Sequence, residues 1–168
     1  AWVWEHQALT RARHCAGDFE LGHRFEAERV HVLTQERDLA KLKSEVLAMR
    51  QKMLDGHPNA SALFDLKHDR GGMVDIEFIV QYLVLAHSHR HGDLVRNLGN
   101  IALLQMASGM RLIDMTLARE VADAYRTFRA LQHRLRLNGA ERARVEPAEV
   151  EAQAAAVRRL WVDVFGAD

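Results

Sequence analysis

The segment FDLKHDRGGMVDIEFIVQYLVLA, residues 64–86, indicates how the rest of the chain must fold. It opens with a charged turn around Lys67, Asp69 and Arg70 and passes through the pair Gly71-Gly72. It continues as an apolar run whose polar members are Asp75, Glu77 and Gln81. A helix at a protein surface has one apolar stripe, whereas this run would be apolar on nearly every side. We therefore expect a helix over about residues 73–89, buried at the centre of a bundle.

The composition is typical of one globular domain. Of the 168 residues 48% are hydrophobic and 27% are charged, so the chain can bury a core. The formal net charge is zero, whereas a dedicated nucleic-acid-binding domain is usually clearly basic. No uninterrupted apolar run approaches the ~20 residues that a membrane-spanning helix needs. We therefore expect neither a nucleic acid nor a membrane among the partners.

The single cysteine, Cys15, excludes an internal disulfide and is typical of a reducing compartment, so we expect a cytoplasmic protein. We expect Cys15 itself to be a small buried residue. The chain enters a helical pattern directly at Ala1, as natural N-termini rarely do. We therefore expect residues 1–168 to be one helical domain and the C-terminal piece of a longer protein.

Hydrophobic spacing predicts an all-α fold of six or seven helices, because no segment alternates like a strand for long. The expected helices cover about residues 2–15, 18–33, 38–54, 73–89, 94–106 and 114–138, with a last one after Pro147. Gly139 suits the position that follows a helix, and Pro147 suits the first turn of the next. The second helix should bury Leu21, Phe25 and Val32. The third should bury Leu39, Leu42, Val46, Met49 and Met53. The last should bury Val150, Ala154, Val157, Trp161 and Val164.

The polar residues of the central helix need partners, because an unpaired buried charge is costly. Asp75 and Glu77 have the carboxylate-x-carboxylate spacing of a two-metal site, but residues two apart on a helix diverge. We therefore expect no metal here and assign Asp75 to the first turn, where the helix dipole favours an acid. Glu77 and Gln81 share a face and should meet a basic residue, for which the candidates are Arg11, Arg13 and Lys67.

Two groups of basic residues and one of histidines have more than one interpretation. Lys67 and Arg70, beside the glycine pair, could hold a phosphate at a helix N-terminus or form a structural salt bridge; the P-loop spacing is absent. Arg126, Arg129, His133 and Arg136 form one stripe, which is either a docking face for an acidic partner or a solvated surface. His87, His89 and His91 could bind a metal, but cationic residues are ordinary at a helix C-terminus.

Three blocks of the sequence resemble glutamine synthetase adenylyltransferases. They are WEHQALTRAR at residues 4–13, FDLK with GGMVDIEFIVQYLVL at 64–67 and 71–85, and YRTFRALQHRLRL at 125–137. The resemblance implies an enzyme with two nucleotidyltransferase units, each followed by a helical region. One unit removes AMP from glutamine synthetase by phosphorolysis, and the other adds AMP from ATP to a tyrosine. The blocks look more like the C-terminal, adenylylating unit.

The resemblance also implies ATP and Mg²⁺, held by a Gly-Ser motif and an Asp-x-Asp pair that this sequence lacks. The catalytic residues are therefore expected upstream, and this chain alone is expected to be inactive and to bind neither. It would line the active cleft, with nucleotide-contact candidates Lys67, Arg70, Arg11 and Arg13. Alternatively, it is a non-catalytic module that docks glutamine synthetase or the PII signal protein through Arg126, Arg129 and Arg136.

Overall fold

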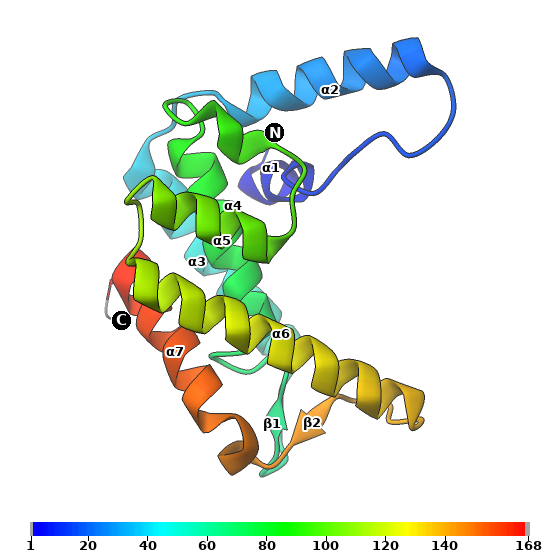
Figure 1. The fold of residues 1–168 in the computed structure, drawn as a ribbon, viewed down its shortest axis with the longest axis vertical. Helices are drawn as coiled ribbons and strands as arrows, with labels where there is room; N and C mark the ends of the chain where they lie inside the picture. Colours follow the sequence, from blue (N-terminus) through cyan, green and yellow to red (C-terminus); the bar gives the residue numbers. More distant parts are fainter. Residues whose placement is uncertain (1, 167–168) are drawn as a thin grey trace.

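The centre of the molecule is helix α4, Met73–His87 (Figure 1). The structure is a computed structural model that describes residues 2–166. All residues of α4 except Glu77, Gln81 and His87 are buried, as the uniformly apolar sequence predicts. The helix ends at His87 rather than 89, with the backbone N–H of Ser88 donating to the Val84 carbonyl.

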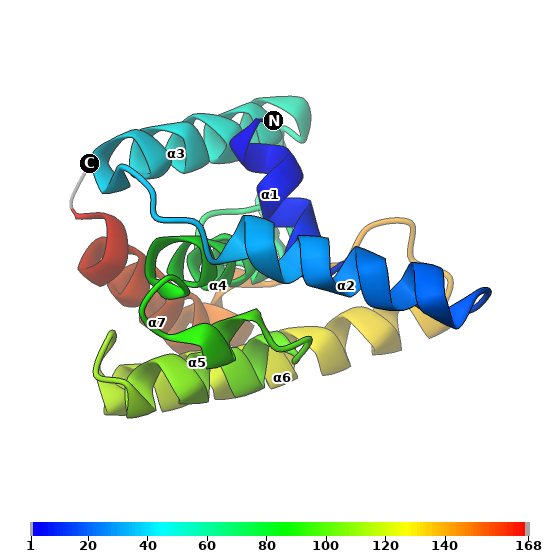
Figure 2. The same ribbon diagram turned by 90° about the horizontal axis from the view of Figure 1, so that it is seen from above.

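The other helices surround α4, which confirms the predicted all-α class. Figure 2 shows α3 on one side of α4, with α6 and α7 on the opposite side and α5 packed against α6. Residues 2–166 contain seven α-helices: α1 (Val3–Leu9), α2 (Phe19–Leu33), α3 (Leu39–Gly56), α4, α5 (Asn100–Gly109), α6 (Met115–Leu137) and α7 (Pro147–Phe165).

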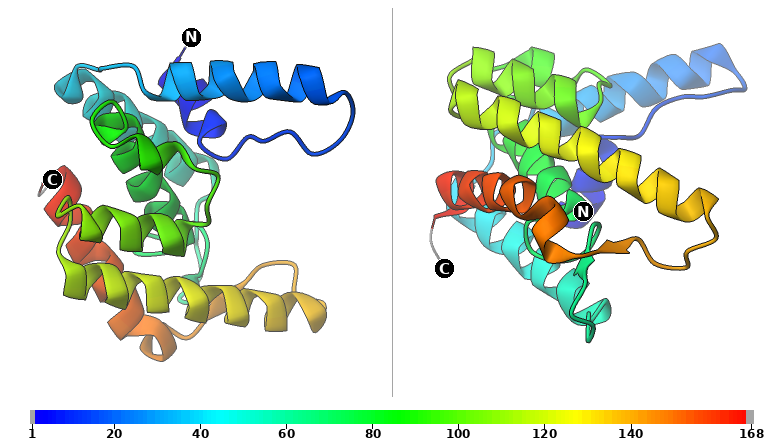
Figure 3. Two further views of the ribbon diagram at one scale, coloured as in Figure 1. Left: turned by 45° about the horizontal axis from the view of Figure 1, so that its top comes forward. Right: turned by 60° about the horizontal axis from the view of Figure 1, so that its bottom comes forward.

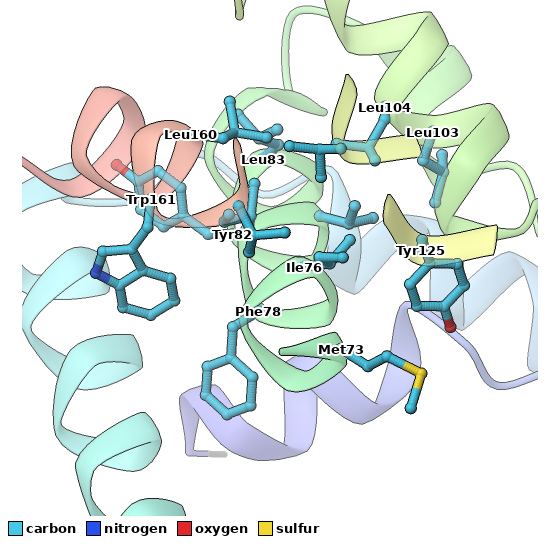
Figure 4. Close-up of a cluster of buried hydrophobic side chains, with 14 of the residues drawn as sticks. Met73, Ile76, Phe78, Tyr82, Leu83, Leu103, Leu104, Tyr125, Leu160 and Trp161 are labelled. Carbon is cyan, nitrogen blue, oxygen red and sulfur yellow. The ribbon is translucent and has the colours of Figure 1, made fainter. Parts of the chain in front are cut away.

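One hydrophobic core joins these helices. Figure 4 shows Ile76 and Leu83 of α4 among side chains from three other helices: Leu104 of α5, Tyr125 of α6 and Leu160 of α7. Each buried aliphatic or aromatic side chain of this kind stabilises the fold by about 1.5–3 kcal/mol. No helix in the described part of the chain is long and apolar enough to cross a membrane.

The N-terminal helices differ most from the prediction. The first helix ends at Leu9 instead of continuing to residue 15, because the buried Thr10 hydroxyl donates to the Gln7 carbonyl and turns the chain. The chain then runs without helix to Asp18, whose carboxylate accepts the Leu21 N–H and begins α2. Cys15 lies on this connection and is exposed rather than buried.

Helix α2 extends away from the body of the molecule (Figures 1 and 3). Its predicted inward face is only partly buried: Leu21 is 65% exposed, and Phe25 and Val32 are half-buried. The fully buried residues are Gly22, Arg29 and Leu33. Arg29 fixes the helix, since its guanidinium donates to the carbonyls of Leu9 and Val95 and pairs with Glu26. The polar contacts of Arg29, rather than a stripe of apolar side chains, therefore hold α2 against the rest of the molecule.

The seam of α3 is also shifted from the prediction. Leu42 and Val46 are buried, but Leu39 is 46% exposed, and Met49 and Met53 are only half-buried. Arg50 takes the next fully buried position, one turn after Val46. Its partner is Asp75 of α4.

Three short elements were not predicted. Strand β1 (Phe64–Asp65) pairs antiparallel with β2 (Arg144–Val145), and two residues are too few for an alternating pattern. A 3-10 turn, η1 (Gly92–Val95), precedes α5, so that helix begins at Asn100 instead of 94.

The C-terminal helices follow the sequence more closely. Gly139 follows α6 with a φ of 81°, and Pro147 is the first residue of α7, as predicted. Of the predicted α7 seam, four residues are buried and Val164 is half-buried. Figure 3 shows α6 and α7 together on one side of the molecule.

Candidate functional site

The charged turn before α4 is held by its own carboxylates. Asp65 accepts the backbone N–H groups of Lys67 and His68, each at 3.0 Å, in the manner of an Asx turn. Asp69 accepts the backbone N–H of Asp65 at 2.8 Å and the side-chain amide of Asn59 at 2.7 Å. These bonds give the turn one conformation and hold the backbone of Lys67 in place.

Two further contacts anchor the turn to its surroundings. The Leu66 N–H donates to the Ala143 carbonyl, next to the paired strands β1 and β2. The Met73 and Val74 N–H groups, at the start of α4, donate to the carbonyls of Leu66 and Lys67. The turn therefore supplies partners for two helix-terminal N–H groups that lack intrahelical ones.

Both glycines of the pair are required by close backbone approaches. Gly71 has a φ of 89°, and an added Cβ would lie 2.8 Å from the Ala154 carbonyl oxygen of α7. At Gly72 a Cβ would lie 2.9 Å from the carbonyl oxygens of Asp69 and Leu66. The pair thus lets the turn fold against both α4 and α7.

Arg50 is the partner of the buried carboxylate. Its Nε lies 2.5 Å from Asp75 Oδ1, and both side chains are at least 95% buried. Asp75 Oδ2 accepts the Gly71 N–H at 2.6 Å, and Arg50 Nη2 donates to the His68 carbonyl at 2.7 Å. The group thereby joins α3, the charged turn and α4. The sequence signal for Arg50 was its position four residues after buried Val46, which the methionine-based seam concealed.

Glu77 and Gln81 do not meet a basic residue, so that prediction is wrong. Tyr125 of α6 donates its hydroxyl proton to Glu77 Oε1 at 3.3 Å, and Gln7 of α1 donates to Gln81 Oε1 at 2.9 Å. Neither partner is charged. A charged partner is not required here, because both acceptors are only half-buried and retain access to water. Asn100 completes the network by donating to the Tyr125 oxygen at 3.0 Å.

A basic pocket opens beside the charged turn. We use this name for the cavity of about 220 Å³ whose charged or titratable walls include His57, Lys67, His68, Arg136 and Arg142. Its walls come from the end of α3, the charged turn, the end of α6 and the loop before β2. Sequence reasoning missed the two histidines and Arg142 as site residues, because the pocket forms only when segments far apart in the chain come together.

Asp65, the acid at this pocket, has its charge compensated. Burial raises its pKa, but the backbone bonds from His68 and Lys67, the charge of His68 and the bond from Arg144 together outweigh burial and hold the pKa below its usual value. Arg144 Nε lies 3.5 Å from its second oxygen. The carboxylate is therefore ionised at neutral pH and directed toward the turn.

The histidines of the pocket are stacked. The rings of His57 and His68 lie 4.1 Å apart between centroids, with an interplanar angle of 6°. Burial lowers the pKa of His68, and the charge of Asp65 opposes this shift only in part. His68 is therefore mainly neutral at pH 7 and is available to take up a proton.

The structure separates the four nucleotide-contact candidates. Only Lys67 lines the basic pocket. Arg70 donates to Gln51 Oε1, and Arg11 donates to the Leu98 carbonyl. Arg13 lines another hollow, beside the start of α2.

The three docking candidates are all exposed on α6. The Arg126 side chain pairs with Asp123, whereas the Arg129 side chain makes no hydrogen bond or ion pair with any residue in 2–166. Arg136 turns toward the basic pocket and donates to the Ala140 carbonyl. The expected stripe is therefore divided between a free surface and the pocket.

The residues in range 2–166 contain no group of three His, Cys, Asp or Glu side chains that could hold a metal ion. His87, His89 and His91 fall within this range, and so do Asp75 and Glu77. The carboxylate of Asp75 is already occupied by Arg50 and the Gly71 N–H. The described residues thus do not fit a Mg²⁺ site.

Comparison with protein families shows the family to which the chain belongs. Residues 37–160 match the family model described as GlnD PII-uridylyltransferase. The chain belongs to this family. The matched range of the GlnD PII-uridylyltransferase family includes Arg50, the charged turn, α4 and the whole basic pocket, but not Arg11 or Arg13.

Similar curated proteins share one description, bifunctional glutamine synthetase adenylyltransferase/adenylyl-removing enzyme. The chain is 61% identical over 99% of its length to the protein from Burkholderia mallei, and 57% identical over 98% to that from Bordetella pertussis. The protein from Nitrosomonas europaea is 50% identical over 99% of the chain. The resemblance found in the sequence is thus confirmed. The chain spans 18% of the length of the first two relatives and 19% of the third.

Proposed function

We propose that this chain is the helical domain of an enzyme that transfers AMP from ATP to a tyrosine of glutamine synthetase and removes it again. The observation that carries the proposal is the 61% identity over 99% of the chain to a relative with that pair of activities in its name. We place residues 1–168 as one domain in the C-terminal, adenylylating unit of this cytoplasmic enzyme, which would regulate nitrogen assimilation.

The role proposed for the domain is structural support of the reaction. The Gly-Ser and Asp-x-Asp motifs of the family's catalytic units are absent from this sequence, and the described residues do not fit a metal site. ATP and Mg²⁺ would therefore be held by another part of the enzyme. This domain would line one side of the cleft and present a positive charge to it.

Lys67 is the residue we assign to nucleotide contact. Its side chain is exposed and makes no hydrogen bond or ion pair within residues 2–166, so its ammonium is available. Its backbone is fixed by the bond to Asp65 and by the bond from Val74. A cation on a rigid turn binds phosphate better than a mobile one, because less conformational entropy is lost.

A kinetic experiment tests this role. In a bifunctional enzyme that contains this domain, Lys67→Ala should lower AMP incorporation into glutamine synthetase about tenfold or more at low ATP, since a charge-assisted contact is lost. Lys41→Ala, an exposed lysine on α3, is the matched control and should leave the rate unchanged. Equal rates for the two variants would reject nucleotide contact by Lys67. AMP transfer by residues 1–168 alone would contradict the supporting role itself.

A second candidate function is docking of glutamine synthetase or the PII signal protein. The observation that favours it is Arg129, an exposed guanidinium on α6 without a partner among residues 2–166. Arg126 lies nearby on the same helix, and Arg136 lies at its far end. Such an arginine surface suits an acidic patch on a protein partner.

Charge reversal separates docking from catalysis. Arg126→Glu combined with Arg129→Glu should weaken partner binding about tenfold or more at low salt, because attraction becomes repulsion. Arg136 is left unchanged, since it lines the basic pocket. Unchanged affinity in a calorimetric titration would exclude this face as the docking surface. A far-ultraviolet circular dichroism spectrum checks that the variant remains folded.

A further inference from the structure

The basic pocket has an excess of positive charge that the fold does not use. Its lining residues include the cations Lys67, Arg136 and Arg142 and the single acid Asp65. Asp65 is compensated by Arg144 and by backbone donors. Because like charges that face one cavity repel, a pocket of this kind is stabilised by an anion.

The donors in the pocket remain available. The side chains of Lys67 and Arg142 make no hydrogen bond or ion pair with any group in residues 2–166. Arg136 uses one guanidinium nitrogen, Nη1, for the Ala140 carbonyl. Its remaining donors are free for a ligand. Guanidinium groups bind phosphate oxygens in a bidentate manner, which makes the pair of arginines selective for oxyanions.

The size of the cavity limits the ligand. Its volume of about 220 Å³ holds several times the ~30 Å³ share of one water molecule. It lies below the ~300 Å³ at which sites for whole small molecules begin. The pocket therefore fits a small group such as a phosphate and is too small to enclose a complete nucleotide.

The stacked histidines link this charge to pH. The Nδ1 of His57 lies 2.9 Å from the Met53 carbonyl oxygen, which can only accept, so this nitrogen carries a proton. The Nδ1 of His68 lies 3.4 Å from Asp65 Oδ1. The other charged groups that line the pocket are Asp65, Lys67, Arg136 and Arg142. Arg144 pairs with Asp65, and Arg50 donates to the His68 carbonyl. Burial first, and then the charges of His57 and Lys67, lower the pKa of His68, and a bound anion would favour its protonated form.

We propose that the basic pocket is a binding site for a small oxyanion, held by Lys67, Arg136 and Arg142, whose affinity rises when His68, stacked on His57, takes up a proton. The anion is free phosphate or the phosphate end of a larger molecule. The site shares Lys67 with the nucleotide contact proposed above, but its existence does not depend on that role, because Arg136 and Arg142 belong to the pocket alone.

Calorimetric titration of the 168-residue chain with inorganic phosphate and, separately, with AMP tests the site. Two or three charge-assisted hydrogen bonds give a dissociation constant on the order of 1 mM. Arg142→Gln should weaken binding about tenfold or more. Arg24→Gln removes the same charge from an exposed position on α2, outside the pocket, and should change binding less than about twofold.

The two ligands distinguish the two sources of the anion. Phosphate binding that is stronger than AMP binding indicates a site for the free ion, and the reverse indicates a phosphate end. Either result supports the site provided that Arg142→Gln weakens binding about tenfold or more and Arg24→Gln does not. Absence of saturable binding for both ligands, or equal losses in the two variants, would overturn the proposal. Because no glutamine synthetase is present, failure here leaves the proposed function intact.

Sulfate tests the histidine pair, since its charge is constant over the range in which histidine titrates. Sulfate should bind more tightly at about pH 5 than at about pH 8, because the pKa of His68 lies below the ordinary value of about 6.5 and bound sulfate favours the protonated ring. His68→Gln should remove most of this difference while phosphate binding at about pH 8 persists. Equal sulfate affinity at both pH values would show that the histidines take no part.

Discussion

The guanidinium of Arg50 and the carboxylate of Asp75 form a buried ion pair between α3 and α4, with 2.5 Å between Nε and Oδ1. The carboxylate uses its second oxygen for the Gly71 N–H, so one acid positions both a neighbouring helix and the glycine turn. A buried pair of this kind adds little net free energy, but loss of one partner leaves a costly charge behind. The pair therefore fixes how α3 and the charged turn meet the central helix.

Loss of Arg50 should destabilise the fold strongly. Arg50→Met should lower the free energy of unfolding by about 3–5 kcal/mol, because Asp75 then lies buried and unpaired. Lys41→Met, at an exposed position of the same helix, should cost less than about 1 kcal/mol. Urea unfolding measures both changes.

A double variant identifies the charge as the cause. Arg50→Met combined with Asp75→Asn should recover much of the loss, because the amide is neutral and its oxygen still accepts the Gly71 N–H. If the single variant unfolds at the same urea concentration as Lys41→Met, the pair does not hold the two helices together.

Gly71 should tolerate alanine less well than Gly139. Both have positive φ, 89° and 81°, but a Cβ at Gly71 would lie 2.8 Å from the Ala154 carbonyl oxygen, whereas nothing lies within 4 Å at Gly139. Gly139→Ala should therefore cost about 1–2 kcal/mol for the backbone conformation alone. Gly71→Ala should cost about 1–3 kcal/mol more, because α7 must move. Thermal unfolding of the two variants compares them, and equal losses would refute the close approach.

Stability should fall as the pH drops below neutrality, partly through His87. Burial, followed by the charges of His91, His89 and Arg90, lowers the pKa of His87 in the folded chain. The unfolded chain therefore binds more protons as pH falls below the ordinary pKa of about 6.5, so stability present above that value is lost toward the lower folded pKa. The melting temperature at about pH 5.5 and about pH 7.5 measures this loss.

His87→Gln should reduce the pH dependence without abolishing it, since burial also lowers the pKa values of His6 and His68. His133→Gln is the control, because His133 is exposed on α6. If both variants retain the full dependence, His87 does not contribute to it.

His89 should be replaceable with a gain in stability. Both of its ring nitrogens are buried without a hydrogen-bond partner within the described chain. His89→Leu removes two unsatisfied polar atoms and should raise the free energy of unfolding by about 1–2 kcal/mol. His91→Leu, two residues along at a half-buried position, gives the comparison. A loss of stability in His89→Leu, measured by urea unfolding, would mean that the ring is satisfied by a partner such as water.

The sequence alone determined the central helix, because a run that is apolar on all sides can only be buried. It also determined the all-α class, the buried seam of α7, the end of α6 at Gly139 and the start of α7 at Pro147. Each of these depends on local periodicity or on the backbone preference of one residue. The family resemblance likewise rests on contiguous blocks, which need no tertiary information.

Only the tertiary structure decided which polar residues are partners. Arg50 was hidden in an apolar seam, and the choice of Tyr125 and Gln7 for Glu77 and Gln81 depended on how α6 and α1 cross α4. Such contacts join residues far apart in the chain, and side-chain chemistry alone allows many pairings.

The same reason explains the basic pocket. Lys67 and Arg136 were assigned separately from the sequence, one to nucleotide contact and one to docking. The fold brings them to one cavity with Arg142 and the stacked histidines. Local periodicity fixes the elements, whereas the site arises from the packing of α3, the charged turn and α6, which no single segment encodes.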